Sequence, residues 1–90
     1  TNNCVLASAA AAEPEGLAVE VLSDATGAIN LSNAAGSASA QQVHETLMVL
    51  LHSNWAAVAD TDAWIEAVAE GRPLDRSDLG SSAVQGRADH

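Results

Sequence analysis

The stretch at residues 41–58, QQVHETLMVLLHSNWAAV, carries the strongest hydrophobic pattern in the chain. At about 100° per residue, its large apolar side chains fall on one broad face, as in an amphipathic helix. Strand alternation does not account for these positions. The pattern therefore predicts a long central helix on which the rest of the chain packs, and its apolar face consists of Val43, Leu47, Leu50, Leu51, Trp55 and Val58.

Both ends of this helix carry local signals. Ser39 followed three residues later by Gln42 matches a capping box, in which each side chain satisfies a backbone N–H group of the first turn. Asn54 projects onto the apolar face, where burying an unpaired amide is unfavourable. We therefore expect the helix to bend, to end, or to hydrogen-bond this amide near Ser53 and Asn54.

The chain before the central helix has strand-like character. Residues 13–16, EPEG, break any regular structure, and residues 17–22, LAVEVL, then alternate apolar and polar positions. A second β-prone run follows at residues 28–32 after a segment rich in turn formers. These features predict a β-hairpin over residues 17–32, with a helix there as the alternative. The preceding residues 1–16 are expected to form an arm, either extended or a short helix.

The chain after the central helix predicts one further helix. Asp60, Thr61 and Asp62 provide acidic and capping groups at a helix start, and Gly71 with Pro73 provides a stop. The expected architecture is an α+β fold, mostly helical, in a single small domain. It comprises the hairpin, a helical part over residues 40–70 with a long and a shorter helix, and a loose polar C-terminal tail over residues 72–90.

Composition excludes several classes of function. The 90 residues carry a formal charge of −9 and no lysine, so the chain repels nucleic-acid phosphates and direct nucleic-acid binding is not expected. No apolar run approaches the roughly 20 residues that cross a bilayer, so no membrane span is expected. Cys4 is the single cysteine, which excludes an internal disulfide. It is interpreted as incidental, with cross-linking of two chains as the alternative.

Two clusters contain side chains that could carry chemistry, and neither predicts a site. His44, Met48 and His52 follow one line of the central helix, but its two histidines are about 12 Å apart at 1.5 Å per residue, too far to share a metal. Asp62, Glu66 and Glu70 form a row that is typical of a solvated helix face. An N-terminal Thr1 nucleophile would need a larger scaffold. The sequence thus predicts no catalytic, cofactor-binding or metal-binding residue.

The surplus of apolar side chains around the central helix suggests association. The predicted function is that of a soluble, acidic, non-enzymatic structural or assembly subunit that forms a homo-oligomer or packs on a larger protein. One alternative is an acidic decoy that occupies a basic nucleic-acid-binding cleft of a partner. Another is a non-catalytic or interface-completed enzyme subunit. The expected interface consists of Leu47, Met48, Val49, Leu51, Trp55 and Trp64.

Overall fold

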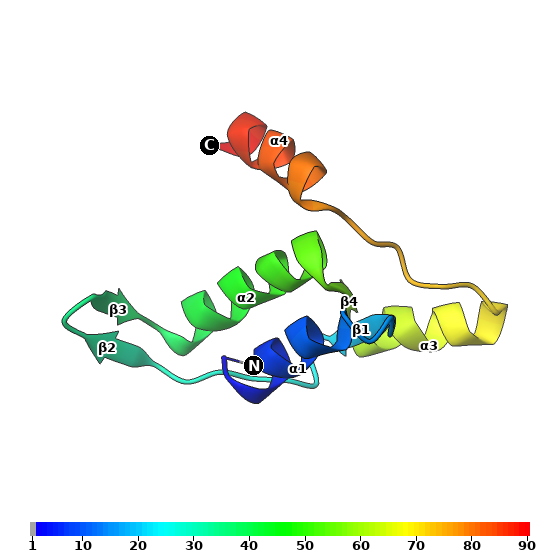
Figure 1. The fold of residues 1–90 in the computed structure, drawn as a ribbon, viewed down its shortest axis with the longest axis horizontal. Coiled ribbons are helices and arrows are strands. Elements are labelled where there is room, and N and C mark those ends of the chain that lie inside the picture. The colour runs from blue at the N-terminus through cyan, green and yellow to red at the C-terminus, as the bar shows by residue number, and fades with distance from the viewer. Residues whose placement is uncertain (1) are drawn as a thin grey trace.

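The computed structural model describes residues 2–90 as a two-stranded parallel sheet flanked by helices, with a small hairpin and a C-terminal helix at the periphery (Figure 1). In chain order, the elements are α1 (Cys4–Ala12), β1 (Val19–Leu22), β2 (Leu31–Asn33), β3 (Gly36–Ala38), α2 (Ala40–Asn54), β4 (Ala56–Ala59), α3 (Thr61–Glu70) and α4 (Leu79–Asp89).

The parallel sheet joins two segments that are distant in sequence. β1 pairs with β4 in parallel, from Val19 opposite Ala56 to Leu22 opposite Ala59. Parallel neighbours cannot be joined by a tight turn and need a crossover, which is usually a helix. The chain between the two strands contains α2, which packs against β4, so β1, α2 and β4 form a βαβ unit.

One face of this sheet packs against α1 and α2. Val21 and Ala56 point to this face and form a core with Met48, Leu51 and Ala9. Leu51 is completely buried. Alanine in α1 gives high helix propensity and also lets this helix approach the sheet closely.

The opposite face of the sheet packs against α3 and the segment that follows it. Ala57 is buried there with Ala67 and Leu74, and Ala59 and Trp64 pack around them. A parallel strand covered by helices on both faces is apolar throughout rather than alternating. The sequence of β4, AAVA, fits this rule because every residue of the strand is buried or half-buried.

The helix boundaries follow the predicted local signals. The capping box at Ser39 and Gln42 is present, so this prediction is confirmed. The central helix ends at Asn54, whose side-chain amide donates to the Leu50 carbonyl at 2.9 Å. α3 begins after Asp60, whose side chain accepts the Ala63 N–H, and stops at Gly71 in the left-handed region, with φ of 68°. None of the helices within residues 2–90 is long and apolar enough to span a membrane.

The mixed, mostly helical character of the fold is as predicted, but the prediction of a hairpin over residues 17–32 is wrong. The first predicted strand pairs with β4, and the only antiparallel pair among the described residues joins β2 to β3, further along the chain. Leu17, the first apolar residue of the predicted first strand, lies outside β1 and is 64% exposed. The reason is that burial between two layers of helices stabilises β1 more than a solvent-exposed local partner would.

Two further boundaries differ from the sequence prediction. The stretch expected to continue the central helix to residue 58 becomes β4 instead, after Trp55 caps α2. The expected loose tail contains α4, which begins after Asp78, whose carboxylate accepts the Ser81 N–H at 2.7 Å. α4 packs near the C-terminal half of α2, after a long extended connection from α3 (Figure 1). Asp78 thus caps a helix that the polar composition of the tail did not indicate.

Candidate active site

Cys4 is the first residue of α1, and its thiol is free and exposed. The N-terminal N–H groups of a helix have no partner within the helix and carry partial positive charge. α2, α3 and α4 each begin with a side chain that accepts one of these N–H groups, whereas Asn3 at the start of α1 does not. The thiol therefore lies beside the first backbone N–H groups of α1, which the Asn3 side chain does not cap.

The thiol borders a cavity of about 370 Å³ between α1 and β1. The walls are mainly apolar, with the Cys4 thiol and the Ser8 hydroxyl as polar groups from α1. The complete lining consists of Cys4, Val5, Ser8, Ala9, Val19, Glu20 and Val21. A mainly apolar cavity with a few polar groups is the usual form of a small-molecule site.

The Glu20 carboxylate does not reach the thiol from β1. Glu20 lies opposite Ala57 in the sheet, and paired residues share a face, which here is the face covered by α3. Its Oε1 accepts a hydrogen bond from Trp64 Nε1 at 3.2 Å on that side. Within the described part of the chain, the lining of this cavity therefore contains a nucleophile but no carboxylate or imidazole that faces it.

Polar groups also gather at the carboxyl ends of β1 and β4, where α/β sheets commonly bind ligands. Asp24 Oδ1 accepts hydrogen bonds from the Thr61 hydroxyl at 2.7 Å and from the Thr61 N–H at 2.8 Å. The hydroxyl first, and then the N–H group, hold the pKa of Asp24 below its ordinary value. These groups satisfy one another, so they connect the ends of the two strands rather than point toward a ligand.

A neighbouring cavity of about 490 Å³ lies along α2 and the end of β1, and its lining includes Ser23, Asp24 and His44. His44 Nε2 lies 2.8 Å from the Ser23 carbonyl oxygen. The ring thus connects α2 to the chain just after β1.

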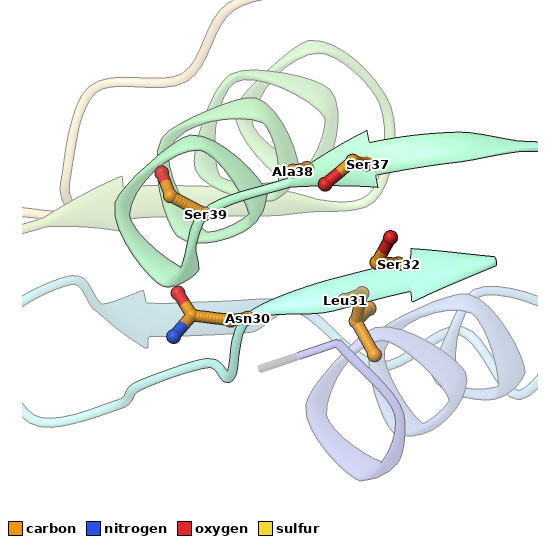
Figure 2. Close-up of a pocket in the computed structure, with 6 residues that line it drawn as sticks. All are labelled: Asn30, Leu31, Ser32, Ser37, Ala38 and Ser39. Carbon is orange, nitrogen blue, oxygen red and sulfur yellow. The ribbon is translucent and has the colours of Figure 1, made fainter.

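Figure 2 shows a different cavity, of about 350 Å³, on the hairpin of β2 and β3. Its polar side chains include Asn30 and Ser39, which lie at the start of α2. Asn30 Oδ1 accepts the Ala40 N–H at 2.7 Å, and Ser39 Oγ accepts the Gln42 N–H at 3.2 Å. Both side chains cap α2. Their oxygens are therefore already hydrogen-bonded, whereas the Cys4 thiol beside the other cavity is free.

The histidine–methionine line of α2 and the acidic row of α3 do not converge on one site. Met48 is in the core, while the His52 ring accepts the Val58 N–H through Nδ1 at 2.9 Å. Among residues 2–90, no three histidine, cysteine or acidic side chains are grouped to hold a metal ion. Asp62, Glu66 and Glu70 are exposed along α3.

The expected interface residues lie in different environments. Met48 and Leu51 are buried beneath the sheet, whereas Val49 is 66% exposed on the outer side of α2. Trp64 packs on the opposite face of the sheet, and Leu47 and Trp55 are half-buried. These six side chains do not form one continuous surface.

Comparison with known proteins finds similarity to a solved structure. No protein-family model and no curated protein match the chain. A crystal structure from Burkholderia xenovorans LB400 does match, with a TM-score of 0.93 and 45% sequence identity. The Burkholderia protein is provisionally assigned as an isochorismatase.

The extent of the match differs between the two proteins. It covers 98% of this chain but 42% of the Burkholderia chain. This chain therefore spans less than half the length of that protein.

The predicted non-enzymatic structural or assembly role is wrong, because the matching structure is assigned as an enzyme. The acidic decoy is overturned by the same finding. The apolar surplus that suggested association is explained in part by the fold, since Met48 and Leu51 of α2 face the sheet. Cys4 was interpreted from the sequence as incidental, because a single cysteine carries no spacing pattern. In the structure it begins α1, just before a run of helix-forming alanines, and borders a cavity.

Proposed function

We propose that the chain is part of a hydrolase of the isochorismatase type and that Cys4 is its nucleophile. The observation that carries this proposal is the 45% identity to the Burkholderia protein over 98% of the chain, at a TM-score of 0.93. A shared fold alone supports no particular activity, but similarity at this level in sequence and structure together supports related chemistry.

Cys4 suits the role of nucleophile for three reasons. Its thiol is free and exposed, it begins a helix whose N-cap residue Asn3 makes no capping hydrogen bond, and it borders a cavity. Helix N-termini favour nearby anions, and the thiolate is the reactive form of cysteine. The structure thus supplies a suitable electrostatic setting and an adjacent space for a substrate.

A cysteine nucleophile favours acyl substrates, namely amides or esters. Sγ attacks the carbonyl carbon, the bond to the amine or alcohol breaks, and the leaving group departs with a proton. Water then cleaves the thioester, which releases a carboxylic acid and restores the thiol. The name of the Burkholderia protein instead implies isochorismate. The proposal therefore has two substrate classes, which an assay can separate.

The test uses a chimera in which this chain replaces the matched segment of the Burkholderia protein. We expect hydrolysis of isochorismate or of a simple amide or ester, with kcat lowered by about 10³-fold or more in Cys4→Ser. Ser37→Ala is the matched control, since it changes an exposed hydroxyl on β3, and it should retain full activity.

Two results would overturn the proposal. A Cys4→Ser chimera as active as the unmodified one would remove the nucleophile. A folded chimera that hydrolyses neither substrate class, and in which iodoacetamide does not label Cys4, would remove the hydrolase function itself.

A further inference from the structure

α2 carries more apolar surface than the parallel sheet covers. Met48 and Leu51 face the sheet and form its core with Val21. Val43 and Leu47 lie roughly 90° around the helix from those two residues, at about 3.6 residues per turn. Both are half-buried, although neither belongs to the cluster beneath the sheet. Some other part of the chain therefore covers this second apolar side of α2.

A cavity of about 350 Å³ lies against this side of α2, and we call it the α2–hairpin cavity. Val43 and Leu47 line it from the helix, and Leu31 and Ala38 line it from the hairpin. Asn2, just before α1, also lines it. Leu31 lies opposite Ala38 in the strand pair, so their side chains share one face of the hairpin. Figure 2 shows the Leu31 side chain pointing toward α1 and away from β3.

Hydrogen bonds fix the hairpin against α2. Asn30, just before β2, accepts the Ala40 N–H through Oδ1 at 2.7 Å. Ser39, just after β3, accepts the Gln42 N–H through Oγ at 3.2 Å, and its own N–H donates to Gln42 Oε1 at 2.8 Å. Both ends of the hairpin are thus attached to the first turn of α2. The cavity between hairpin and helix therefore exists before a ligand binds, which reduces the entropy cost of binding.

Within residues 2–90, no charged side chain lines the α2–hairpin cavity, although the chain carries a formal charge of −9. Its polar groups are the neutral side chains of Asn2, Gln42 and Thr46. The cavities beside β1 differ, because Glu20 lines one and Asp24 lines the other. Burying an anion without a partner is strongly unfavourable, whereas an apolar group gains free energy by leaving water. The α2–hairpin cavity is therefore suited to a neutral, apolar ligand.

The cavity also lies close to the proposed nucleophile. Asn2 lines it, and Cys4 follows two residues later, so the Cα atoms of these two residues are at most about 7 Å apart. An ester or amide whose carbonyl carbon is held at Cys4 Sγ can extend an acyl chain over a comparable length. In a thioester the acyl group stays attached to Sγ while the leaving group departs. A cavity at this distance is thus placed to hold the acyl part of a substrate.

We infer that the α2–hairpin cavity is a subsite that binds the neutral aliphatic acyl chain of an ester or amide substrate. Its uncharged walls favour such a chain over isochorismate, which is a dicarboxylate. The catalytic role of the subsite rests on the proposed function, because hydrolysis depends on Cys4. Binding of an aliphatic ligand does not depend on it, so the two can be tested separately.

Binding is tested by NMR in the chimera described above, with the methyl signals of Leu31, Val43 and Leu47 as reporters. The probe is hexanamide. Its charged counterpart is adipamic acid, which adds a carboxylate at the far end of the same carbon chain. We expect hexanamide to shift the methyl signals at millimolar concentration, as a small ligand with few contacts does. Adipamic acid should bind at least about tenfold more weakly, because its carboxylate would enter an uncharged cavity.

Selectivity is tested with ethyl acetate, ethyl butyrate and ethyl hexanoate as substrates of the same chimera. Burying one methylene group should raise kcat/KM about fourfold, until the cavity is full. Ethyl butyrate should also be a better substrate than its isomer butyl acetate, because only the acyl chain enters the subsite. Equal or faster hydrolysis of butyl acetate would contradict the acyl assignment.

A matched pair of variants places one carboxylate on either face of the hairpin. Leu31→Asp directs it into the cavity, whereas Ser32→Asp directs it to the opposite face, because successive side chains of a strand alternate. Both positions are exposed, so both variants should fold, which far-UV circular dichroism checks. We expect Leu31→Asp to lower the ratio of kcat/KM for ethyl hexanoate to that for ethyl acetate by at least about tenfold. Ser32→Asp should keep this ratio within about twofold.

Several results would overturn the inference. One is the absence of methyl shifts with hexanamide in the folded chimera, which would show that the rest of the Burkholderia polypeptide fills the cavity. Another is the same ratio for the two esters in the original chimera and in its Leu31→Asp variant. Methyl shifts without hydrolysis of any ester would retain the subsite as a binding site and reject the proposed function. Cys4-dependent hydrolysis without methyl shifts or chain-length preference would retain the proposed function and reject the subsite.

Discussion

The chain contains two sheets of two strands each, and they differ in what stabilises them. β2 and β3 are neighbours in sequence, pair in antiparallel fashion and are almost entirely exposed. β1 and β4 are separated by the whole of α2, pair in parallel and lie between helices on both faces. A short turn joins the two strands of the hairpin, whereas the parallel pair is stabilised by side chains from the three helices α1, α2 and α3. Changes beneath the parallel pair should therefore have much larger effects than changes in the hairpin.

The largest effect is expected for Leu51→Ala. Leu51 is completely buried beneath the parallel pair, and truncating a buried leucine lowers the free energy of unfolding by about 2–5 kcal/mol. The matched control is Val49→Ala on the same helix, where 66% exposure predicts a change within about 0.5 kcal/mol. Urea denaturation followed by far-UV circular dichroism measures both. Equal losses in the two variants would contradict the assigned core.

A smaller loss is expected for His52→Ala. The Val58 N–H at the outer edge of β4 loses its acceptor, and an unsatisfied, partly buried donor costs roughly 1–2 kcal/mol. His52→Asn offers a carbonyl oxygen and should recover part of the stability. Faster exchange of the Val58 amide in His52→Ala alone is the direct measurement. If this amide exchanges equally in all three proteins, the ring does not cover the edge.

The connection between the ends of β1 and β4 should depend on pH. Hydrogen bonds from Thr61 lower the pKa of Asp24 in the folded chain relative to the unfolded one. Their stabilising contribution is thus present above about pH 4 and is lost as pH falls through the lowered pKa. Stability measured against pH should show a difference between the original chain and Asp24→Asn that shrinks on acidification. Thr61→Val, which keeps the N–H donor, should lose only part of that difference.

The smallest effect is expected in the hairpin. Leu31→Ala on β2 removes a side chain that is already 42% exposed, so the free energy of unfolding should change by about 0.5 kcal/mol or less. Val21→Ala on β1 is the corresponding change in the parallel pair, where the side chain is 6% exposed, and it should cost clearly more. Thermal unfolding of the two variants gives the ranking. A larger loss for Leu31→Ala would reverse the comparison between the two sheets.

The features that could be predicted are those encoded within a few residues. Ser39 and Gln42 cap α2, and Asp60 and Gly71 bound α3, because each signal acts through hydrogen bonds within one helical turn. The tail was misread because Asp78 is the only strong local sign of α4. β4 was misread as helix because alanine has high helix propensity and low strand propensity.

The candidate site also combines a feature that is visible in the sequence with features that only the fold creates. Cys4 and the alanine run after it were visible in the sequence, but its cavity also needs Val19 and Val21, which lie beyond a turn. Glu20 could have been taken for a catalytic base beside the thiol. Only the register with Ala57 and the hydrogen bond from Trp64 direct its carboxylate to the other face of the sheet.

The sequence by itself determined where α2 begins, where α3 begins and ends, and the mostly helical character of the chain. The tertiary structure alone decided that β1 pairs with β4 and not with a local partner. It also decided that Cys4 borders a cavity between α1 and β1. The physical reason is the sequence separation between the residues that interact. Caps and stops are hydrogen bonds between near neighbours, whereas a parallel strand pair is stabilised by apolar burial against helices that come from all parts of the chain.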